Sequence, residues 1–522
     1  MRPILYCAVS LTILIFSPQL LAAKKRSKVS RVDLDFKRVF NLYEIDAYKN
    51  TAIWQKLAEF QKNPKLSRKY RTPLRQLQAR LLVEAGYPLA ASFVAAATIQ
   101  AVKDPGSKRM NPSWSILSRV SKKRPILFIL EDLSLKLKLN GYPYKFGSDW
   151  NYVKANALLE KGFNDRASIF FKRINMSSRY FMPAKYQQAM LLIEAGNLKA
   201  AKSSLKAILL PSSRENSPIS LSDKREMTNY AHMALGRILY QEKKFLTSAR
   251  YFRKVRKDSP LYYDALFEQS WSLFMSGNGR HSLGSLYGID SPFFADRQNP
   301  EAKILESIVF YWMCRYQDSR NSLADFAEEY TATVEKLGGY LNRRHLNPKN
   351  AYDLFENLVS GVSEDSLGIP RQILQIAANR DTMLLVRDQL ASVMSELSRL
   401  RANGVFGNKV GFADIEKALQ ETQDKIKNRL GRIFIQEIKE EKSIYEELYS
   451  QAQFLYLELL MSEKEQIMGR ELHKGGKLAQ AGANEIRGWG LDTQSWKGGN
   501  KGEFWWDEVG FHIVDVENKC ID

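Results

Sequence analysis

Cysteine is the residue type in this chain that could form a covalent cross-link. Three cysteines occur: Cys7 in an apolar N-terminal stretch, and Cys314 and Cys520 in the rest of the sequence. If the first 23 residues are removed, an even pair remains, and an oxidising compartment would favour a disulfide between them. That bond would close a loop of about 200 residues and stabilise the fold by about 3–5 kcal/mol in the chain-entropy picture. The alternative is a buried Cys314 and a free thiol at Cys520.

The other residue types that bind metals or perform catalysis form no recognisable set. No two of the five histidines are spaced His-x-x-x-His, and none joins Cys and Asp at ligand spacing; they are His232, His281, His345, His473 and His512. Gly-x-Ser-x-Gly, phosphate-loop and dinucleotide motifs are absent. We therefore expect no metal, no cofactor and no catalytic residue, and predict that the protein is not an enzyme. The rival is a cell-wall hydrolase on a helical solenoid, which would need a cleft carboxylate in a compact catalytic domain.

Size-matched residues recur at intervals of 34 in the middle of the chain. One copy consists of Ala155, Leu158, Gly162, Ala167, Phe171 and Ile174, and the next of Ala189, Leu192, Gly196, Ala201, Leu205 and Ile208. Another consists of Leu235, Gly236, Leu239, Ser248, Phe252 and Val255, followed by Gln269, Ser270, Leu273, Ser282, Leu286 and Ile289, in which Gln269 is the one clear mismatch. Partial copies contain Ala79 and Ala91, and Ser307 and Ser319. A fixed period of this length indicates stacked structural units.

The spacing within one copy predicts a pair of helices. Small residues at the eighth and twentieth positions let the two helices approach closely, and glycine at the fifteenth relieves the turn between them. Each pair cannot cover its own apolar face, so stacking supplies the core. The pattern resembles the tetratricopeptide repeat family over about residues 70–330, although residues 104–147 fit only as an irregular pair. The resemblance implies an all-α solenoid, with irregular helical repeats at 24–147 and a regular array at 148–330.

Beyond the array the pattern changes to longer helices. We expect connecting helices at 331–369, and Pro370 is well placed to begin a long helix because its fixed φ suits the first turn. Asn403-Gly404 ends that helix, and a second begins near Asp414 with apolar side chains at three- and four-residue spacing. Such stripes indicate helix pairing. We predict a long antiparallel hairpin over residues 370–474, paired within the chain, with homodimerisation through it as the alternative.

The C-terminal segment, residues 475–522, is rich in glycine and tryptophan. It contains too many aromatic side chains to remain solvated. The candidate residues for capping or interaction are Trp489, Trp496, Phe504, Trp505, Trp506, Asp507, Glu508 and Phe511. In one interpretation this tail docks on the helical body as a cap. In the other it is a partner-binding segment, because tryptophan is enriched at binding hot spots.

The first residues have the features of a secretory signal. Arg2 supplies positive charge, a short apolar run follows at 4–16, and small residues before and at Ala23 offer a cleavage site. We therefore expect a signal peptide at 1–23 and a periplasmic or cell-envelope location. An uncleaved anchor is the alternative, because the basic residues at 24–28 resist translocation.

The formal net charge of +21 favours anionic surfaces. No zinc-finger spacing, RNP-like motif or concentrated basic helix is present, so nucleic acid is not the expected partner. Acidic lipids, glycans or acidic proteins of the envelope fit better. The simpler alternative is that the basic residues are spread over solvated helix faces.

Together, Cys314-Arg315-Tyr316 in a repeat, the helical hairpin and a terminal Glu-Phe-Trp-Trp-Asp-Glu-x-Gly-Phe segment before Cys520 resemble bacterial envelope tetratricopeptide proteins of the gliding-motility type. The resemblance implies an accessory of a large envelope machine and transfers no catalytic residue. We therefore expect an exported scaffold that binds envelope proteins; an anionic lipid- or glycan-binding protein is the alternative. The partner, the process and the oligomeric state do not follow from the sequence.

Overall fold

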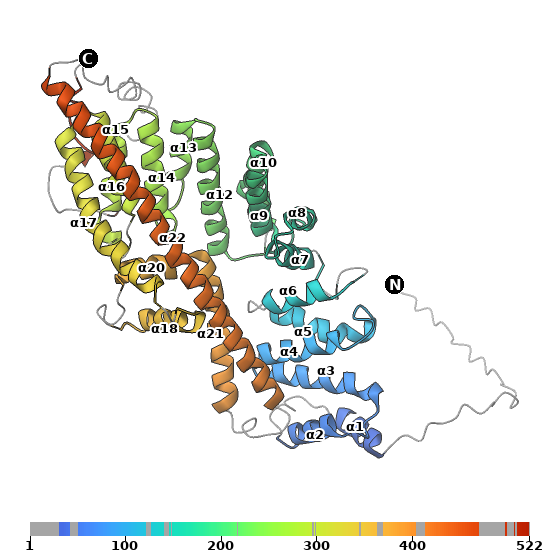
Figure 1. The fold of residues 1–522 in the computed structure, drawn as a ribbon. Helices are drawn as coiled ribbons and strands as arrows, with labels where there is room; N and C mark the ends of the chain where they lie inside the picture. The colour runs from blue at the N-terminus through green and yellow to red at the C-terminus, as the bar shows by residue number, and fades with distance from the viewer. Residues whose placement is uncertain are drawn as a thin grey trace, which may run out of the picture.

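The computed structural model describes residues 31–41, 51–121, 127–139, 143, 146–147, 149–216, 218–294, 297, 299–343, 346–362, 369–402, 413–468, 496–497, 506 and 509–520. These residues are mostly helical, so the predicted all-α class is confirmed (Figure 1). Their strands are limited to β1 (Trp496–Lys497) and β2 (His512–Ile513), which pair in parallel. In this part of the chain, no helix combines the length and the apolar character needed to cross a membrane.

The α-helices fall into an N-terminal group, a central series and a C-terminal group. The N-terminal group is α1 (Arg31–Asn41), α2 (Thr51–Lys62), α3 (Arg68–Glu84), α4 (Pro88–Gln100), α5 (Asn111–Ser121) and α6 (Leu127–Lys136). The central series is α7 (Asp149–Leu159), α8 (Asn164–Lys172), α9 (Phe181–Glu194), α10 (Leu198–Leu209), α11 (Pro211–Asn216), α12 (Leu221–Gln241), α13 (Phe245–Phe252), α14 (Tyr262–Met275), α15 (Gly279–Ile289), α16 (Pro300–Trp312) and α17 (Tyr316–Leu341). The C-terminal group is α18 (Pro348–Val359), α20 (Arg371–Ala378), α21 (Asp381–Ala402) and α22 (Ala413–Ile467).

Successive helices pack in pairs, and small residues lie where the two helices of a pair meet. The pairs are α3 with α4, α7 with α8, α9 with α10, α12 with α13, α14 with α15, and α16 with α17. Each pair has a small residue buried on both helices: Ala79 and Ala91, Ala155 and Ala167, Ala189 and Ala201, Gly236 and Ser248, Ser270 and Ser282, and Ser307 and Ser319. The small side chains allow close packing of the helices, as the spacing in the sequence predicts.

In the last three pairs, a serine hydroxyl also hydrogen-bonds across the contact. Ser248 Oγ donates to the Gly236 carbonyl at 2.7 Å, and Ser282 Oγ donates to the Ser270 carbonyl at 2.9 Å. Ser307 Oγ lies 3.0 Å from the Ser319 carbonyl. Because these hydroxyls are buried and satisfied, serine can replace alanine at these positions without an unpaired polar group.

The turn inside each pair contains one residue with left-handed backbone. Four of these residues are the glycines Gly86, Gly162, Gly196 and Gly277. The other two are Lys243 and Cys314, with φ of 59° and 53°. Left-handed backbone costs a non-glycine residue about 1–2 kcal/mol. The turn geometry is therefore retained at two positions where the sequence lacks the glycine that favours it.

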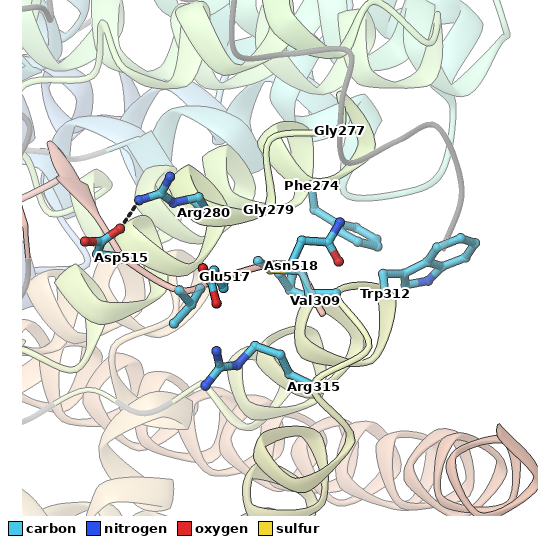
Figure 2. A pocket seen from close by; sticks show the side chains of 12 residues that line it. Phe274, Gly277, Gly279, Arg280, Val309, Trp312, Arg315, Asp515, Glu517 and Asn518 are labelled. Carbon is cyan, nitrogen blue, oxygen red and sulfur yellow. Dashed lines mark hydrogen bonds and ion pairs between the residues drawn. The ribbon is translucent and has the colours of Figure 1, made fainter. Parts of the chain in front are cut away.

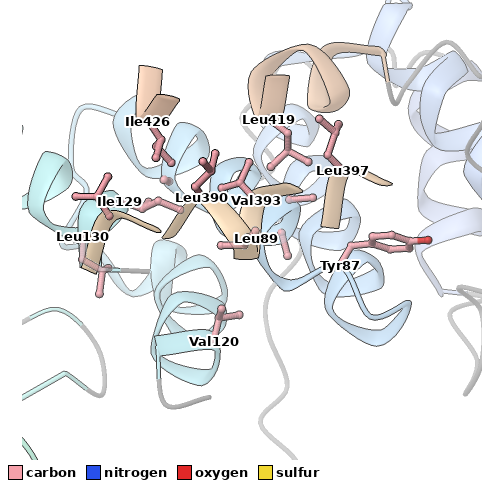
Figure 3. Packing of buried hydrophobic residues seen from close by; sticks show 14 of the residues in the cluster. Tyr87, Leu89, Val120, Ile129, Leu130, Leu390, Val393, Leu397, Leu419 and Ile426 are labelled. Carbon is pink, nitrogen blue, oxygen red and sulfur yellow. The ribbon is translucent and has the colours of Figure 1, made fainter. Parts of the chain in front are cut away.

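Helices from both ends of the described chain share one apolar core. Buried side chains of α4 to α6 pack against those of α21 and α22, and Figure 3 shows the contact between Leu89, Ile129, Leu397 and Leu419. Separate clusters lie along the central series and between α16, α17 and the second half of α22. The central series is therefore bridged by α21 and α22 (Figure 1).

The C-terminal group differs in detail from the expected hairpin. The helix expected from Pro370 is divided into α20 and α21, and α17 extends past residue 330 to Leu341. The 55 residues of α22 correspond to about 80 Å of straight helix. α21 packs on α22, which also contacts α18, α17, α16 and α20. α22 is longer than one hairpin partner requires because its apolar stripe continues along the central series.

A buried carboxylate joins α21 to the first turn of α4. Glu396 accepts hydrogen bonds from the backbone N–H groups of Leu89 at 3.0 Å and Ala90 at 2.7 Å. The Glu396 side chain has no exposed surface. A carboxylate satisfies free N–H groups at a helix N-terminus and interacts favourably with the helix dipole. This contact therefore fixes the orientation of α21 on the N-terminal group.

A methyl group at Gly236 should destabilise the α12–α13 pair. An added Cβ would lie 2.6 Å from the Phe252 ring, so we expect Gly236→Ala to cost about 1–3 kcal/mol of unfolding free energy through overpacking. The control is Gly339→Ala in α17, where an added Cβ meets nothing within 4 Å. Chemical denaturation should show a loss of stability for the first variant alone, and equal stabilities would contradict this packing.

Candidate partner-binding site

The first helices of successive pairs form one continuous layer. α9 contacts α12, α12 contacts α14, and α14 contacts α16. We call the exposed side of this layer the first-helix surface. Half-buried aromatic side chains lie along it, and the rings of Tyr186 and Tyr230 meet edge to face with centroids 5.4 Å apart. Partly exposed aromatic side chains provide contact area with little loss of conformational freedom, which suits recognition of another protein.

A pocket of about 350 Å³ opens between three of these helices. Its lining residues come from α12, α13, α14 and α16 and are Arg237, Tyr240, Phe252, Glu268, Trp271 and Glu301. We call it the first-helix pocket. Its volume is at the lower end of the range for ligand sites, about 300–1,000 Å³. It is therefore large enough for one long side chain of a bound segment.

Two interactions hold the polar groups of the first-helix pocket in place. The Arg237 Nε donates to both carboxylate oxygens of Glu268 at 2.9 Å. The indole Nε1 of Trp271 donates to Glu301 Oε1 at 3.1 Å. Each interaction joins two successive helix pairs, so the pocket is preorganised by the stacking itself.

The first-helix pocket contains more negative than positive groups. Burial raises the pKa of Glu301, and the negative charges of Glu268 and Glu447 raise it further, while the hydrogen bond from Trp271 opposes the shift. The nearby cation, Arg237, already pairs with Glu268. A cationic side chain entering beside Trp271 would gain both carboxylate and ring contacts. The pocket is therefore suited to a lysine or arginine side chain.

The described part of the tail packs on α14, α15 and α16. Val509 is fully buried there, and its carbonyl accepts a hydrogen bond from the Tyr262 hydroxyl at 2.8 Å. The Val514 N–H donates to the Arg280 carbonyl at 3.2 Å, and Lys519 N–H donates to the Met313 carbonyl at 2.9 Å. The tail therefore runs as an extended segment across α14 and α15 to the end of α16.

Among the candidate tail residues, Trp506 and Phe511 are the two whose side chains the structure describes. The Trp506 ring lies 5.2 Å from that of Phe293, centroid to centroid, and remains 39% exposed. The Phe511 ring lies under two cations, with Arg253 at 4.7 Å and Lys257 at 4.9 Å from its centroid. For Trp496 the structure gives the backbone, in β1. Trp489, Phe504, Trp505, Asp507 and Glu508 lie outside the described residues.

A disulfide joins the tail to the turn between α16 and α17. The Cys314 and Cys520 Cα atoms are 4.9 Å apart, and their sequence separation is 206. Cys314 occupies the left-handed turn position described above. The bond therefore fixes the end of the described tail where the last helix pair turns.

A second pocket, of about 620 Å³, lies between the tail and two helix turns (Figure 2). Phe274 and Trp312 line its apolar side, and Arg315 and Glu517 provide charge. Arg280 on its rim forms an ion pair with Asp515 of the tail. Because one wall consists of tail residues, this pocket exists in this form only while the tail is docked.

His512 of β2 is a tail residue that is buried against α15. It is 4% exposed, and its ring meets that of Tyr287 edge to face. Neither ring nitrogen has a hydrogen-bond partner among the described residues. Burial, with a smaller contribution from Lys257, lowers the pKa of His512. The neutral ring is therefore the form that fits the docked tail.

Sequence reasoning does not identify the first-helix pocket. Its signal is weak but present: Arg237 and Trp271 lie 34 residues apart, each one position after the small residue of its first helix. That position points away from the paired helix and is free to vary for binding. Glu301 lies in the next pair at a different position, so the repeat pattern does not reveal it. In the described residues, no cluster of His, Cys, Asp or Glu could hold a metal ion.

A methyl group at Gly284 should displace the tail. An added Cβ would lie 1.9 Å from the His512 carbonyl oxygen, so β2 must move away from α15 in Gly284→Ala. In the docked tail, the Val514 amide is protected by its hydrogen bond to the Arg280 carbonyl. Hydrogen exchange at this amide should then be at least about tenfold faster. Gly288→Ala is the matched control, because its Cβ would meet tail atoms only at 3.4 Å. Unchanged exchange in Gly284→Ala would mean that the tail is not held there.

No family model matches this chain, and no curated protein is significantly similar to it. The features of this chain that bear on function are therefore the first-helix surface and the docked tail.

Proposed function

We propose that this protein is a tetratricopeptide-type scaffold that binds other proteins in a bacterial envelope assembly. The helix pairs, with their buried small residues at the predicted positions, support this assignment. So does the stacking of successive pairs, because a helical solenoid presents an extended surface for binding. In this proposal α21 and α22 are the long hairpin that follows the solenoid.

The disulfide between Cys314 and Cys520 supports export. Disulfides persist in oxidising compartments such as the periplasm and are rare in the cytosol. The expected signal peptide lies outside the described residues. The envelope location therefore depends on the disulfide and on the sequence features of the N-terminus.

The observation that carries the proposed function is the first-helix pocket. It lies between successive first helices and combines the Trp271 ring with the carboxyl group of Glu301, which accepts a hydrogen bond from Trp271. We propose that an extended partner segment lies along the first-helix surface and inserts a lysine or arginine side chain into this pocket. The aromatic pair Tyr186 and Tyr230 would contact the same segment farther along.

The bridge formed by α21 and α22 would keep this surface in one shape. The Arg429 guanidinium of α22 lies 2.9 Å from the Glu160 carboxylate beside the end of α7, and the Tyr311 hydroxyl lies 3.1 Å from Ser462 Oγ of α22. α22 is thus joined to both ends of the central series. A preorganised surface loses less conformational entropy on binding, which increases affinity.

The excess of basic residues favours a second function, binding of an anionic lipid or glycan. The formal net charge is +21. Contacts between exposed charges are screened by salt, with a Debye length of about 8 Å at physiological ionic strength. Binding that disappears with moderate salt would favour this function, and binding that persists would favour the first-helix pocket.

Substitutions in the first-helix pocket should weaken binding of the partner protein. We expect Trp271→Ala, and separately Glu301→Gln, to weaken partner binding at least about tenfold, since a buried cation loses either its ring or its carboxylate. The measurement is photo-crosslinking in cells, with a photo-reactive amino acid in place of Tyr240. The crosslinked protein is then identified, and its yield is compared between variants. Lys206→Glu, on the exposed side of α10, is the control and should leave crosslinking unchanged. The pocket proposal is wrong if both pocket variants crosslink the same protein at unchanged yield.

A further inference from the structure

The second half of α22 has apolar side chains on two opposite faces. One face is buried against α16 and α17 through Leu448, Ala452, Leu455 and Leu459. The other face remains open. Its exposed side chains include Phe454 at 71%, Leu457 at 56% and Met461 at 65%, and Met468, one residue beyond the end of α22, is 52% exposed. Tyr456, Leu460 and Ile467 are also exposed beside them.

The exposed face, which we call the α22 stripe, has the spacing of a helix-pairing seam. Phe454, Leu457, Met461, Lys464 and Met468 follow one another at intervals of three, four, three and four residues. This is the spacing that brings side chains onto one line for packing against a second helix. Large exposed apolar patches on a folded protein mark interaction sites. The stripe therefore indicates a helix partner that the described residues do not supply.

One charged residue within the α22 stripe and one beside it indicate which partner fits. Glu458 and Lys464 lie at equal distances in sequence before and after Met461. In an antiparallel pair of α22 helices centred on Met461, Glu458 of each copy lies opposite Lys464 of the other. The same arrangement places Phe454 opposite Met468, and sulfur–aromatic contacts are favourable. A parallel pair would instead place Glu458 opposite Glu458 and Lys464 opposite Lys464.

We propose that the α22 stripe binds the α22 stripe of a second copy, which produces a two-fold symmetric dimer. Such an interface uses the same patch on both subunits, and a self-complementary pattern is what it requires. Figure 1 shows this end of α22 at the edge of the molecule, far from the N-terminal helices. The first-helix pocket is lined by residues of α12, α13, α14 and α16 and by none of α22, so the dimer would present two such pockets in one assembly.

Analytical ultracentrifugation of the full exported chain tests the proposal. The unmodified protein should sediment as a dimer, and Leu457→Glu with Met461→Glu should weaken the dimer more than about a hundredfold, because four apolar side chains leave the interface. Ile169→Glu is the control: it replaces a 49% exposed apolar side chain on α8 and should leave the dimer intact. Circular dichroism should show that all variants remain folded.

The antiparallel register has its own test. Met461→Cys should form a covalent dimer with itself under mild oxidation, whereas Phe454→Cys should do so only when mixed with Met468→Cys. Glu458→Lys alone should weaken the dimer, and addition of Lys464→Glu should restore it.

Three results would overturn the proposal. A monomeric protein at about 100 μM would overturn it, and a loss of stability in the stripe variants would then show that the stripe is covered by this chain's own segment between residues 468 and 496. Stripe-dependent binding of the monomer to vesicles of phosphatidylethanolamine and phosphatidylglycerol would show a lipid surface instead. Self-crosslinking of Phe454→Cys would show a parallel pair. None of these results bears on the first-helix pocket, so the two proposals can fail separately.

Discussion

The structure depends on the apolar core that helices near both ends of the described chain share. Leu89 and Ile129 of the N-terminal group are buried together with Leu397 and Leu419 of α21 and α22. Stacked helix pairs normally contact only their neighbours, so the curvature of such an array can vary. Each buried large apolar side chain contributes about 1.5–3 kcal/mol, so this core provides a strong contact between distant parts of the array. The central series is held by its two ends as well as by its own stacking.

Beyond the shared core, α22 also packs on the last helix pair and carries the α22 stripe. Its second half packs on α16 and α17, so the same helix reaches from the N-terminal group to the last helix pair. Its outward face there carries the α22 stripe, whereas the first-helix surface lies on other helices. The docked tail covers α14 to α16 at the same end, where the disulfide fixes it. Partner binding, tail docking and self-association would therefore use separate surfaces of one frame.

The sequence predicts the features that depend on local spacing. Small residues at a period of 34 identify the helix pairs, because close packing of two helices requires a small side chain such as Ala189 or Gly236 at the contact. The density of aromatic residues indicates that the tail docks rather than remaining solvated, and Trp506 and Phe511 do contact the body. Both features are determined by residues that lie close together in the sequence.

Contacts between distant segments mostly do not follow from the sequence, although the cysteine count offers the Cys314–Cys520 disulfide as one of two alternatives. An apolar stripe shows that a helix is paired but does not identify its partner, so the particular contacts of α22 with α18, α17 and α16 do not follow from it. Glu396 resembles any carboxylate on a charged helix until the first turn of α4 is placed against it. Trp271 and Glu301 meet because separate repeats stack, and Lys243 and Cys314 adopt left-handed backbone without the glycine that would signal it.

Hydrogen exchange in a Glu396 variant tests the shared core most directly. Glu396→Ala removes the acceptor for the Leu89 and Ala90 amides and leaves two buried donors unpaired, each at a cost of about 1–3 kcal/mol. If the bridge holds the two ends together, exchange should become faster in α3, α4 and α21, with α9 and α10 unchanged. Exchange in α4 equal to that of the unmodified protein would contradict a core that joins both ends of the chain.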